Sequence, residues 1–319
     1  MNGKGKNGEK RIVAKRKKAP IKHWSHSSLM AFLRNPLAWY KRYVEEIYDN
    51  PRTPASIVGS AGHKALEHFY RQVSENQVIA LESLGRANAG GKTSSEYFLK
   101  KSYSGAPKDI AIQKGLEYVR NIADFEIDFG RAKTRMAKKK KRALMEAEYL
   151  RAISYYLARP PKHKVLGVEV RGIVEIEGLP LPIKAISDLV VESKIQKGAV
   201  DIVDHKFVAS FSKGGAAKSL FVIQAIFNYY TVREMFGKPV RRFIVYECKK
   251  TKNADGSPQM RRYIIDFKER REDFKVFYRL VNDATEEISR QRKYLPNPSD
   301  MFEGDNSFDI YRLELVDDD

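Results

Sequence analysis

Cysteine is almost absent from this sequence: Cys248 is the single one in 319 residues. One cysteine cannot form a disulfide within the chain or supply the ligands of a zinc ribbon. Long hydrophobic runs are also missing, since no stretch of about 18 apolar residues occurs, so we expect no transmembrane helix. The N-terminus lacks the apolar core of a signal peptide and the serine-rich pattern of a transit peptide. These features predict a cytoplasmic protein.

Acidic residues are scarce relative to basic ones. The chain has 59 Lys+Arg against 40 Asp+Glu, a net charge of +19, which favours a polyanionic partner such as nucleic acid or an acidic membrane surface. Residues 1–20 are rich in lysine and predict a disordered basic tail that touches phosphates. A second basic run, KKKKR, comprises Lys138, Lys139, Lys140, Lys141 and Arg142. It is either a solvated helix face or a ridge that faces nucleic acid.

The order of expected elements defines the fold class. Apolar spacing predicts helices within 25–47, 56–73 and 109–158, and β-branched runs predict a strand meander from about 163, with turns at Glu177-Gly178 and Lys197-Gly198. A helix ending at Gly237, two more strands and a helix over 268–293 follow. This order predicts an α/β or α+β fold. We expect residues 21–319 to form a single domain, with a helical, partly mobile insertion at about 74–160.

The stretch ISDLVVESKIQKGAVDIVDHKFV, residues 186–208, places acids inside apolar strands. Residues two apart in a strand share a face, so Asp204 and Lys206 point one way and the side chain of His205 points the other. We therefore predict a packing or surface role for the His205 ring. The distance in sequence from Asp188 to Asp204 suits a hairpin that brings the two carboxylates together.

Two neighbouring carboxylates repel unless a cation lies between them, and Mg²⁺ prefers oxygen ligands. A metal held by Asp188, Asp204 and the backbone carbonyl of His205 could activate a water molecule, with Lys206 positioning that water or stabilising charge on phosphorus. Such a set suits phosphodiester hydrolysis. The alternative is a structural ion pair between Asp204 and Lys206.

The spacing of these residues resembles the signature of the PD-(D/E)XK nuclease superfamily, and the chain is similar to its RecB-like branch of CRISPR-associated and phage exonucleases. SHSSLMAFLRNP (25–36) matches the opening motif of that branch, except that Asn35 replaces a cysteine. GSAGHKALEHFY (59–70) matches a G-x-x-x-H motif at Gly59 and His63. The cysteines that hold an iron–sulfur cluster in that branch are missing, so we expect no cluster and predict that ordinary packing replaces the clamp it provides.

This resemblance implies a mixed central sheet flanked by helices, with helical additions, and a role for each matching residue. His63, Asp188 and Asp204 would bind Mg²⁺ or Mn²⁺, and Lys206 would be the catalytic lysine. Glu169 would help hold the reacting water, although a structural ion pair fits it equally. Gln224 would contact DNA or orient the site. Tyr229 would replace a family tyrosine whose position is taken by Asn228.

The expected function is a metal-dependent deoxyribonuclease, an exonuclease acting on duplex ends or single strands in DNA recombination, repair or phage DNA processing, with recombination or replication proteins as further partners and no membrane. A structure-specific endonuclease is one alternative. A non-catalytic DNA-binding accessory protein on a nuclease-like fold is another, and a basic RNA-processing module is a third.

Overall fold

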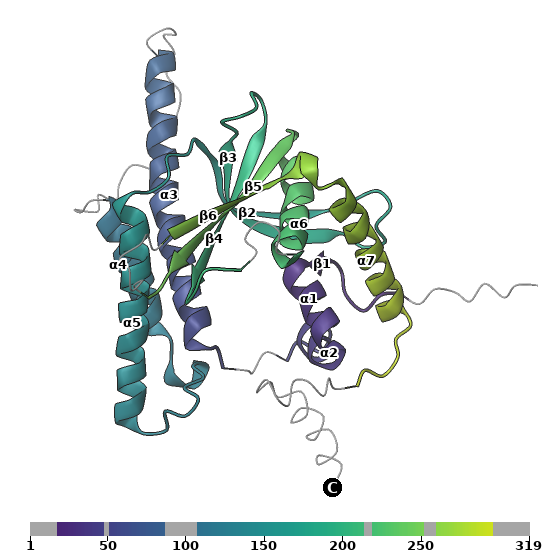
Figure 1. The fold of residues 1–319 in the computed structure, drawn as a ribbon, viewed down its shortest axis with the longest axis horizontal. Helices are drawn as coiled ribbons and strands as arrows, with labels where there is room; N and C mark the ends of the chain where they lie inside the picture. Colours follow the sequence, from purple (N-terminus) through teal and green to yellow (C-terminus); the bar gives the residue numbers. More distant parts are fainter. Residues whose placement is uncertain (1–17, 48–50, 87–106, 214–218, 252–259, 296–319) are drawn as a thin grey trace, which may run out of the picture.

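The computed structural model describes residues 18–47, 51–86, 107–213, 219–251 and 260–295 (Figure 1). The segments outside these ranges include most of the predicted basic tail, most of the Gly/Ser/Lys-rich stretch before residue 107, and the chain after residue 295.

The α-helices are α1 (His26–Arg34), α2 (Pro36–Tyr43), α3 (Pro54–Arg86), α4 (Pro107–Asn121), α5 (Arg135–Ala158), α6 (Ser219–Phe236) and α7 (Arg271–Ser289). The strands are β1 (Trp24–Ser25), β2 (Val165–Val174), β3 (Ile183–Glu192), β4 (Val200–Val208), β5 (Val240–Lys249) and β6 (Met260–Asp266). Short 3₁₀ turns, η1 (Asp124–Glu126) and η3 (Phe267–Glu269), join some of these elements. None of the described helices is both long and apolar enough to cross a membrane.

The six strands form one mixed sheet in the order β1-β3-β4-β5-β6, with β2 also paired to β3. The β2–β3–β4 meander and the β5–β6 hairpin are antiparallel, whereas β1 runs parallel to β3 and β4 runs parallel to β5. The predicted α/β fold with a mixed sheet is confirmed. Gly178 and Gly198 adopt φ values of +83° and +79° in the two predicted meander turns, a conformation that favours glycine.

Helices cover both faces of the sheet, as Figure 1 shows: α3, α4 and α5 lie on one side, and α6, α7, α1 and α2 on the other. Each layer has its own apolar core. The first is built around side chains such as Ile57, Tyr149 and Val203, and the second around Trp39, Ile202 and Phe227. Because β4 contributes to both cores, its backbone is held firmly from both sides, which fixes the residues that it carries.

Local capping explains how the N-terminal helices begin. Ser25 accepts a hydrogen bond from the N–H of Ser28, and the Ser28 hydroxyl accepts one from the N–H of Ser25, which is a capping box. Asn35 caps α2 in the same way by accepting from the N–H of Ala38 at 3.1 Å, and Pro36 occupies the first helical position. Asn35, which the resemblance aligns with a cysteine, therefore has a structural function as a helix cap.

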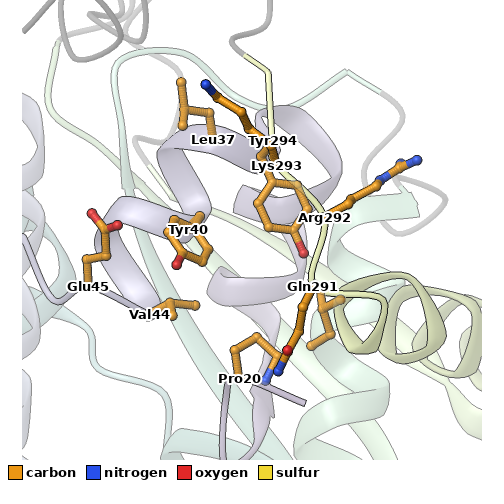
Figure 2. A pocket seen from close by; sticks show the side chains of 10 residues that line it. Pro20, Leu37, Tyr40, Val44, Glu45, Gln291, Arg292, Lys293 and Tyr294 are labelled. Carbon is orange, nitrogen blue, oxygen red and sulfur yellow. The ribbon is translucent and has the colours of Figure 1, made fainter. Parts of the chain in front are cut away.

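The chain after α7 packs back on α1 and α2. The ring of Tyr294 lies 6.2 Å from Phe32, 5.8 Å from Trp39 and 5.6 Å from Tyr40, centroid to centroid. Tyr294 and Tyr40, both labelled in Figure 2, lie side by side and line a cavity of about 560 Å³. Aromatic packing thus ties the two ends of the described chain together.

Candidate active site

The site lies where β3 and β4 separate. Their pairing runs from Glu192↔Val200 to Leu189↔Val203 and stops one position before Asp188 and Asp204. Oδ2 of Asp188 instead accepts a hydrogen bond from the backbone N–H of His205 at 2.7 Å. The carboxylate thus replaces a rung of the ladder, and it holds the two strands in a fixed relation while their acidic side chains remain beside the opening.

Glu169 approaches Asp188 from the other edge of β3. The pairs Val168↔Leu189 and Val170↔Ser187 flank it, so Glu169 is opposite Asp188 in the register. Its φ is +49°, a left-handed conformation that costs a non-glycine residue about 1–2 kcal/mol. Backbone strain of this kind persists where the surrounding structure imposes it, and it is frequent at functional sites.

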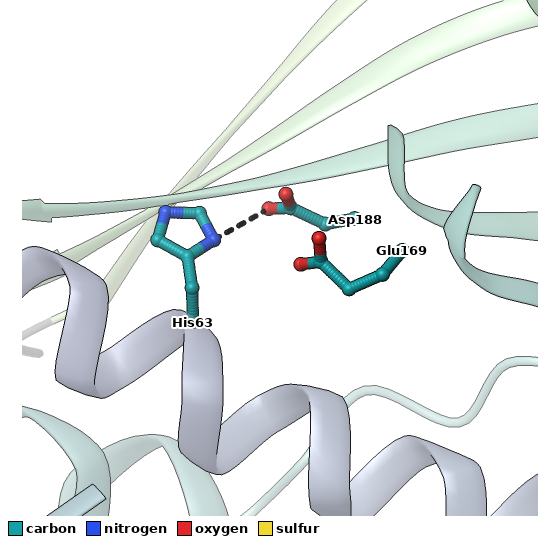
Figure 3. A group of neighbouring side chains, drawn as sticks. All are labelled: His63, Glu169 and Asp188. Carbon is teal, nitrogen blue, oxygen red and sulfur yellow. Dashed lines mark ion pairs between the residues drawn. The ribbon is translucent and has the colours of Figure 1, made fainter. Parts of the chain in front are cut away.

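His63 reaches the same point from α3, and Figure 3 shows its ring directed at Asp188 with Glu169 alongside. Nδ1 of His63 lies 3.3 Å from Oδ2 of Asp188. The helix passes close to β4 at Gly62, where an added Cβ would lie 2.2 Å from the ring of Phe207. A larger residue would have to displace this ring, so glycine here lets the helix that carries His63 lie close to the sheet.

The charges of His63 and Asp188 stabilise each other. Burial by itself would lower the pKa of the imidazole, but attraction and hydrogen bonding to Asp188, together with the charge of Asp204, raise it to about 9. Burial likewise opposes ionisation of Asp188, yet His63 and the hydrogen bonds from His205 hold the pKa of this carboxyl well below its ordinary value. Without a metal ion, the pair is an imidazolium and a carboxylate at neutral pH.

One ligand atom from each of His63, Glu169 and Asp188 lies within 4.8 Å of the other two. An imidazole nitrogen with two carboxylates is a donor set that fits Mn²⁺ and, through its oxygens, Mg²⁺. This grouping shares His63 and Asp188 with the predicted set and adds Glu169, and the role of Asp204 as a metal ligand stays a prediction. A cation in this position would relieve the repulsion between the two carboxylates.

Asp204 is held by other partners. The Nζ atom of Lys206 lies 3.0 Å from Oδ1 and 2.8 Å from Oδ2 of this carboxylate, and Nε2 of Gln224 on α6 donates to Oδ1 at 2.8 Å. Burial and the charge of Asp188 raise the pKa of Asp204, although Lys206 acts in the opposite direction. For Lys206, burial lowers the pKa but attraction to Asp204 outweighs it, so the ammonium is charged at neutral pH. Lys206 therefore acts as a cation and hydrogen-bond donor.

The position of the His205 ring agrees only in part with the prediction. The ring is buried, 1% exposed, and it packs between Tyr70 and Tyr246 with interplanar angles of 25° and 20°. The packing role is therefore correct, but the expectation that the ring turns wholly away from the site is wrong, since Nδ1 lies 3.3 Å from Oδ2 of Asp188. The cause is the separation of β3 and β4, which lets the Asp188 carboxylate reach across to β4.

The residues predicted to bind DNA are dispersed. Gln224 lines the cleft that holds Asp188, Asp204 and Lys206, whereas the ring of Tyr229 packs 4.8 Å from Phe267 and 4.9 Å from Phe274, between α6 and the α7 region. Tyr229 is therefore not brought to the site.

The basic run on α5 is only partly available to a ligand. Lys141 donates to the carbonyl of Phe129 at 3.0 Å, Lys138 lies over the Phe129 ring, and Arg142 pairs with Asp124. These three side chains hold the segment between α4 and α5 in place. Lys139 and Lys140 remain exposed, which favours the solvated face over a continuous ridge.

The cleft itself has a volume of about 490 Å³ and includes residues that sequence reasoning missed. Arg171, Lys64 and Ile186 line it, together with Ser60 and Tyr118. Arg171 follows Glu169 by two positions in β2, so strand alternation was a signal that could have found it.

Comparison with known proteins agrees with this geometry. The family model of the PD-(D/E)XK nuclease superfamily matches residues 23–301, and the chain belongs to this superfamily. A search of curated proteins gives no match. Among solved structures, the crystal structure of SSO0001 is similar with 16% sequence identity and a TM-score of 0.26, covering 81% of this chain and 83% of that one. A likeness at this level supports no statement about function.

Proposed function

We propose that this protein is a metal-dependent deoxyribonuclease of the RecB-like branch that acts as an exonuclease. The observation that carries the proposal is the convergence of His63, Glu169 and Asp188 beside the Asp204–Lys206 pair in one open cleft. We further propose that residues 21–319 form a single cytoplasmic nuclease domain, in which the described helices α4 and α5 of the region at about 74–160 form a wall beside the cleft.

Each group of the cleft has a chemical task in this proposal. His63, Glu169 and Asp188 would hold a Mg²⁺ or Mn²⁺ ion, which would act as a Lewis acid toward water and offset phosphate charge. Lys206 places its ammonium near the non-bridging phosphate oxygens and stabilises the charge that develops on them. Asp204 orients Lys206, and Gln224 in turn fixes Asp204 through its amide. In the reaction, a water molecule gives up a proton as its oxygen bonds to phosphorus, the ester P–O bond breaks, and the leaving oxygen takes up a proton.

The experiment that tests this function is a digest of linear duplex, closed circular duplex and end-labelled single-stranded DNA with Mg²⁺ or Mn²⁺. Asp188→Asn and Lys206→Ala proteins are compared with Lys197→Ala, an exposed lysine in the turn between β3 and β4. We expect wild type and Lys197→Ala to degrade linear DNA, Lys206→Ala to lose roughly a hundredfold to a thousandfold of the rate, and Asp188→Asn to be inactive.

The pattern of products separates the alternatives. Degradation of linear DNA with survival of the circle supports an exonuclease, whereas nicking of the circle supports an endonuclease. If wild type binds DNA but cleaves no substrate with either metal, the protein is a DNA-binding accessory and the proposed function is wrong. Co-purification with recombination or replication proteins from extracts would address the proposed partners.

A further inference from the structure

Four side chains form a continuous strip on β2 and β3 directly beyond the acidic residues. The register pairs Arg171 with Ile186 and Ile173 with Lys184. Residues 171 and 173 point away from α6, because a Cβ at the intervening Gly172 would meet Met235 and Thr231 of that helix. Ile173 is 59% exposed and Ile186 is 41% exposed. The two exposed isoleucines lie on one sheet face, each directly opposite a basic residue. An exposed apolar patch of this kind often marks a binding surface.

This strip joins two cavities. The active-site cleft includes Arg171 and Ile186, and a neighbouring groove of about 640 Å³ includes Ile186 and Lys184. The two cavities also share Gln224, which donates to Asp204. A ligand that enters the cleft therefore has a continuous path along β3 toward the start of α1.

The path exists because one edge of β3 is incompletely paired. β2 pairs with β3 from Ile183 to Val191, so β1 and β4 must both lie on the opposite edge. On that edge β1 pairs only with Ile183 and Lys184, and β4 pairs only from Leu189 onward. Among the described strands, residues 185–188 have no partner there, and the groove lies beside this gap.

The far end of the groove is basic. Lys22, His23 and Lys184 line it with a single acidic residue, Glu46. Within the described part of the chain neither lysine has an ion pair with a carboxylate. Burial first, and then the charges of Lys184 and Lys22, lower the pKa of His23, which indicates that the positive charge at this end is not compensated.

We propose that the strip of Arg171, Ile173, Lys184 and Ile186, continued by Lys22, binds the scissile strand of DNA in unpaired form on one side of the cleaved bond. The inference rests on the proposed nuclease function and adds the direction in which the substrate leaves the site. Lys184 is four residues from Asp188, about 13 Å along an extended strand, so it contacts a phosphate beyond the scissile one. Arg171 and Lys184 bind phosphates, while the two isoleucines pack against sugars and bases.

Binding measured without metal separates this inference from catalysis. The affinity of full-length protein for a fluorescent single-stranded oligonucleotide is measured in EDTA over a range of salt concentrations, with a blunt duplex alongside. The test variant is Lys22→Ala/Lys184→Ala, and the matched control is Lys197→Ala/Lys238→Ala, two exposed lysines near the opposite end of the sheet. Each double variant removes the same charge.

We expect the test variant to bind the single strand at least about tenfold more weakly, with the slope of log K against log salt reduced by about 1.4 for two lost phosphate contacts. The control should match wild type. Equal slopes in the two double variants would overturn the inference, as would a loss confined to the blunt duplex. If wild type cleaves nothing but the slopes differ, the strip binds DNA and the proposed function fails. If wild type cleaves DNA but the slopes are equal, the protein is a nuclease and the strip does not bind its substrate.

A second measurement locates the contact. Oligonucleotides that each carry one uncharged methylphosphonate linkage are cleaved by wild type and by Lys184→Ala. We expect wild type to lose kcat/KM when the uncharged linkage lies a fixed distance from the scissile bond, and Lys184→Ala to be insensitive at that same position. The same sensitivity in both proteins would show that Lys184 contacts none of these phosphates.

Discussion

Asp188 and His205 contact each other twice: Oδ2 of the carboxylate accepts the backbone N–H of His205 at 2.7 Å and lies 3.3 Å from Nδ1 of its ring. The other ring nitrogen, Nε2, lies 2.8 Å from the hydroxyl of Tyr156, which lies 2.7 Å from that of Tyr70. With the tautomer that carries hydrogen on Nδ1, donors run in one direction from Tyr70 through Tyr156 and His205 to Asp188. A buried hydrogen-bonded chain of this kind fixes the orientation of the carboxylate that it ends on.

Removal of the ring nitrogens of His205 should weaken metal binding while preserving the fold. His205→Phe keeps an aromatic ring between Tyr70 and Tyr246 but cannot donate to Asp188, so we expect Mn²⁺ affinity to fall roughly tenfold to a hundredfold. Calorimetric titration of the purified protein measures it. The control is Tyr246→Phe, which keeps the stacked ring and removes a hydroxyl that faces His163. Equal Mn²⁺ affinities for His205→Phe and wild type would show that the ring does not position Asp188.

The pH dependence of metal binding should reflect His63. Although burial favours the neutral ring, Asp188 raises the pKa of His63 to about 9, so at neutral pH a cation must displace a proton from it. We therefore expect Mn²⁺ affinity to increase with pH up to about 9, with proton release at pH 7 detectable by calorimetry in two buffers of different ionisation enthalpy. Binding without proton release would contradict this assignment.

The stability of the metal-free protein should decrease with pH, whereas Mn²⁺ affinity increases. Because burial is outweighed by Asp188, the pKa of His63 in the folded state lies above the ordinary 6.5. The stabilisation from the charged His63 ring is therefore complete below about pH 6.5 and is lost as pH rises through about 9. Asp188→Asn leaves burial and the weaker attraction of Asp204 but removes the main attraction, so the pKa of His63 should fall well below about 9. The ring proton signals of His63 in a pH titration by NMR measure both values.

The left-handed backbone at Glu169 predicts an unusual order of stabilities. Glycine adopts a φ of +49° without strain and alanine does not, so Glu169→Gly should be more stable than Glu169→Ala by about 1 kcal/mol. This reverses the usual order in a strand, where glycine is the less favourable residue. Urea unfolding of both metal-free variants gives the difference. If alanine is at least as stable as glycine, the backbone of β2 relaxes at this position and holds no strain.

Much of this site follows from local rules, and the rest depends on how distant segments meet. Alternation along one strand is enough to place Lys206 beside Asp204, and glycine-containing turns are enough to predict the meander. The position of Glu169 beside Asp188 depends on the register of β2 against β3, and the reach of Asp188 to the His205 ring depends on where β3 and β4 stop pairing. Sequence periodicity does not determine where the pairing of β3 with β4 ends. That end point is set by the way β1 and β4 share one edge of β3.

The same limit explains the outcome for Tyr229. Its position after Gln224 suggested a DNA contact, but five residues along a helix of 3.6 residues per turn place its side chain on a different face from Gln224, where it packs against Phe267 and Phe274. The sequence shows which residues share a face of a helix, but it does not show which part of the protein that face packs against. Exposure of Ile173 could not be predicted for a similar reason, since a β-branched residue in a strand is ordinarily expected to be buried.

Tyr294 provides a test of whether aromatic packing holds the C-terminal segment, as predicted from a sequence with a single cysteine. Its side chain is buried, 7% exposed, and in the described part of the chain its hydroxyl has no hydrogen-bond partner. Tyr294→Ala leaves a cavity against Phe32 and Trp39 and should cost about 3 kcal/mol of stability. Tyr294→Phe keeps the ring contacts and removes a buried, unsatisfied hydroxyl, so it should be neutral or slightly stabilising. Thermal unfolding of the two variants, with limited proteolysis to detect release of the segment after α7, measures both effects. Equal losses for alanine and phenylalanine would mean that the hydroxyl, and not the ring, holds this segment.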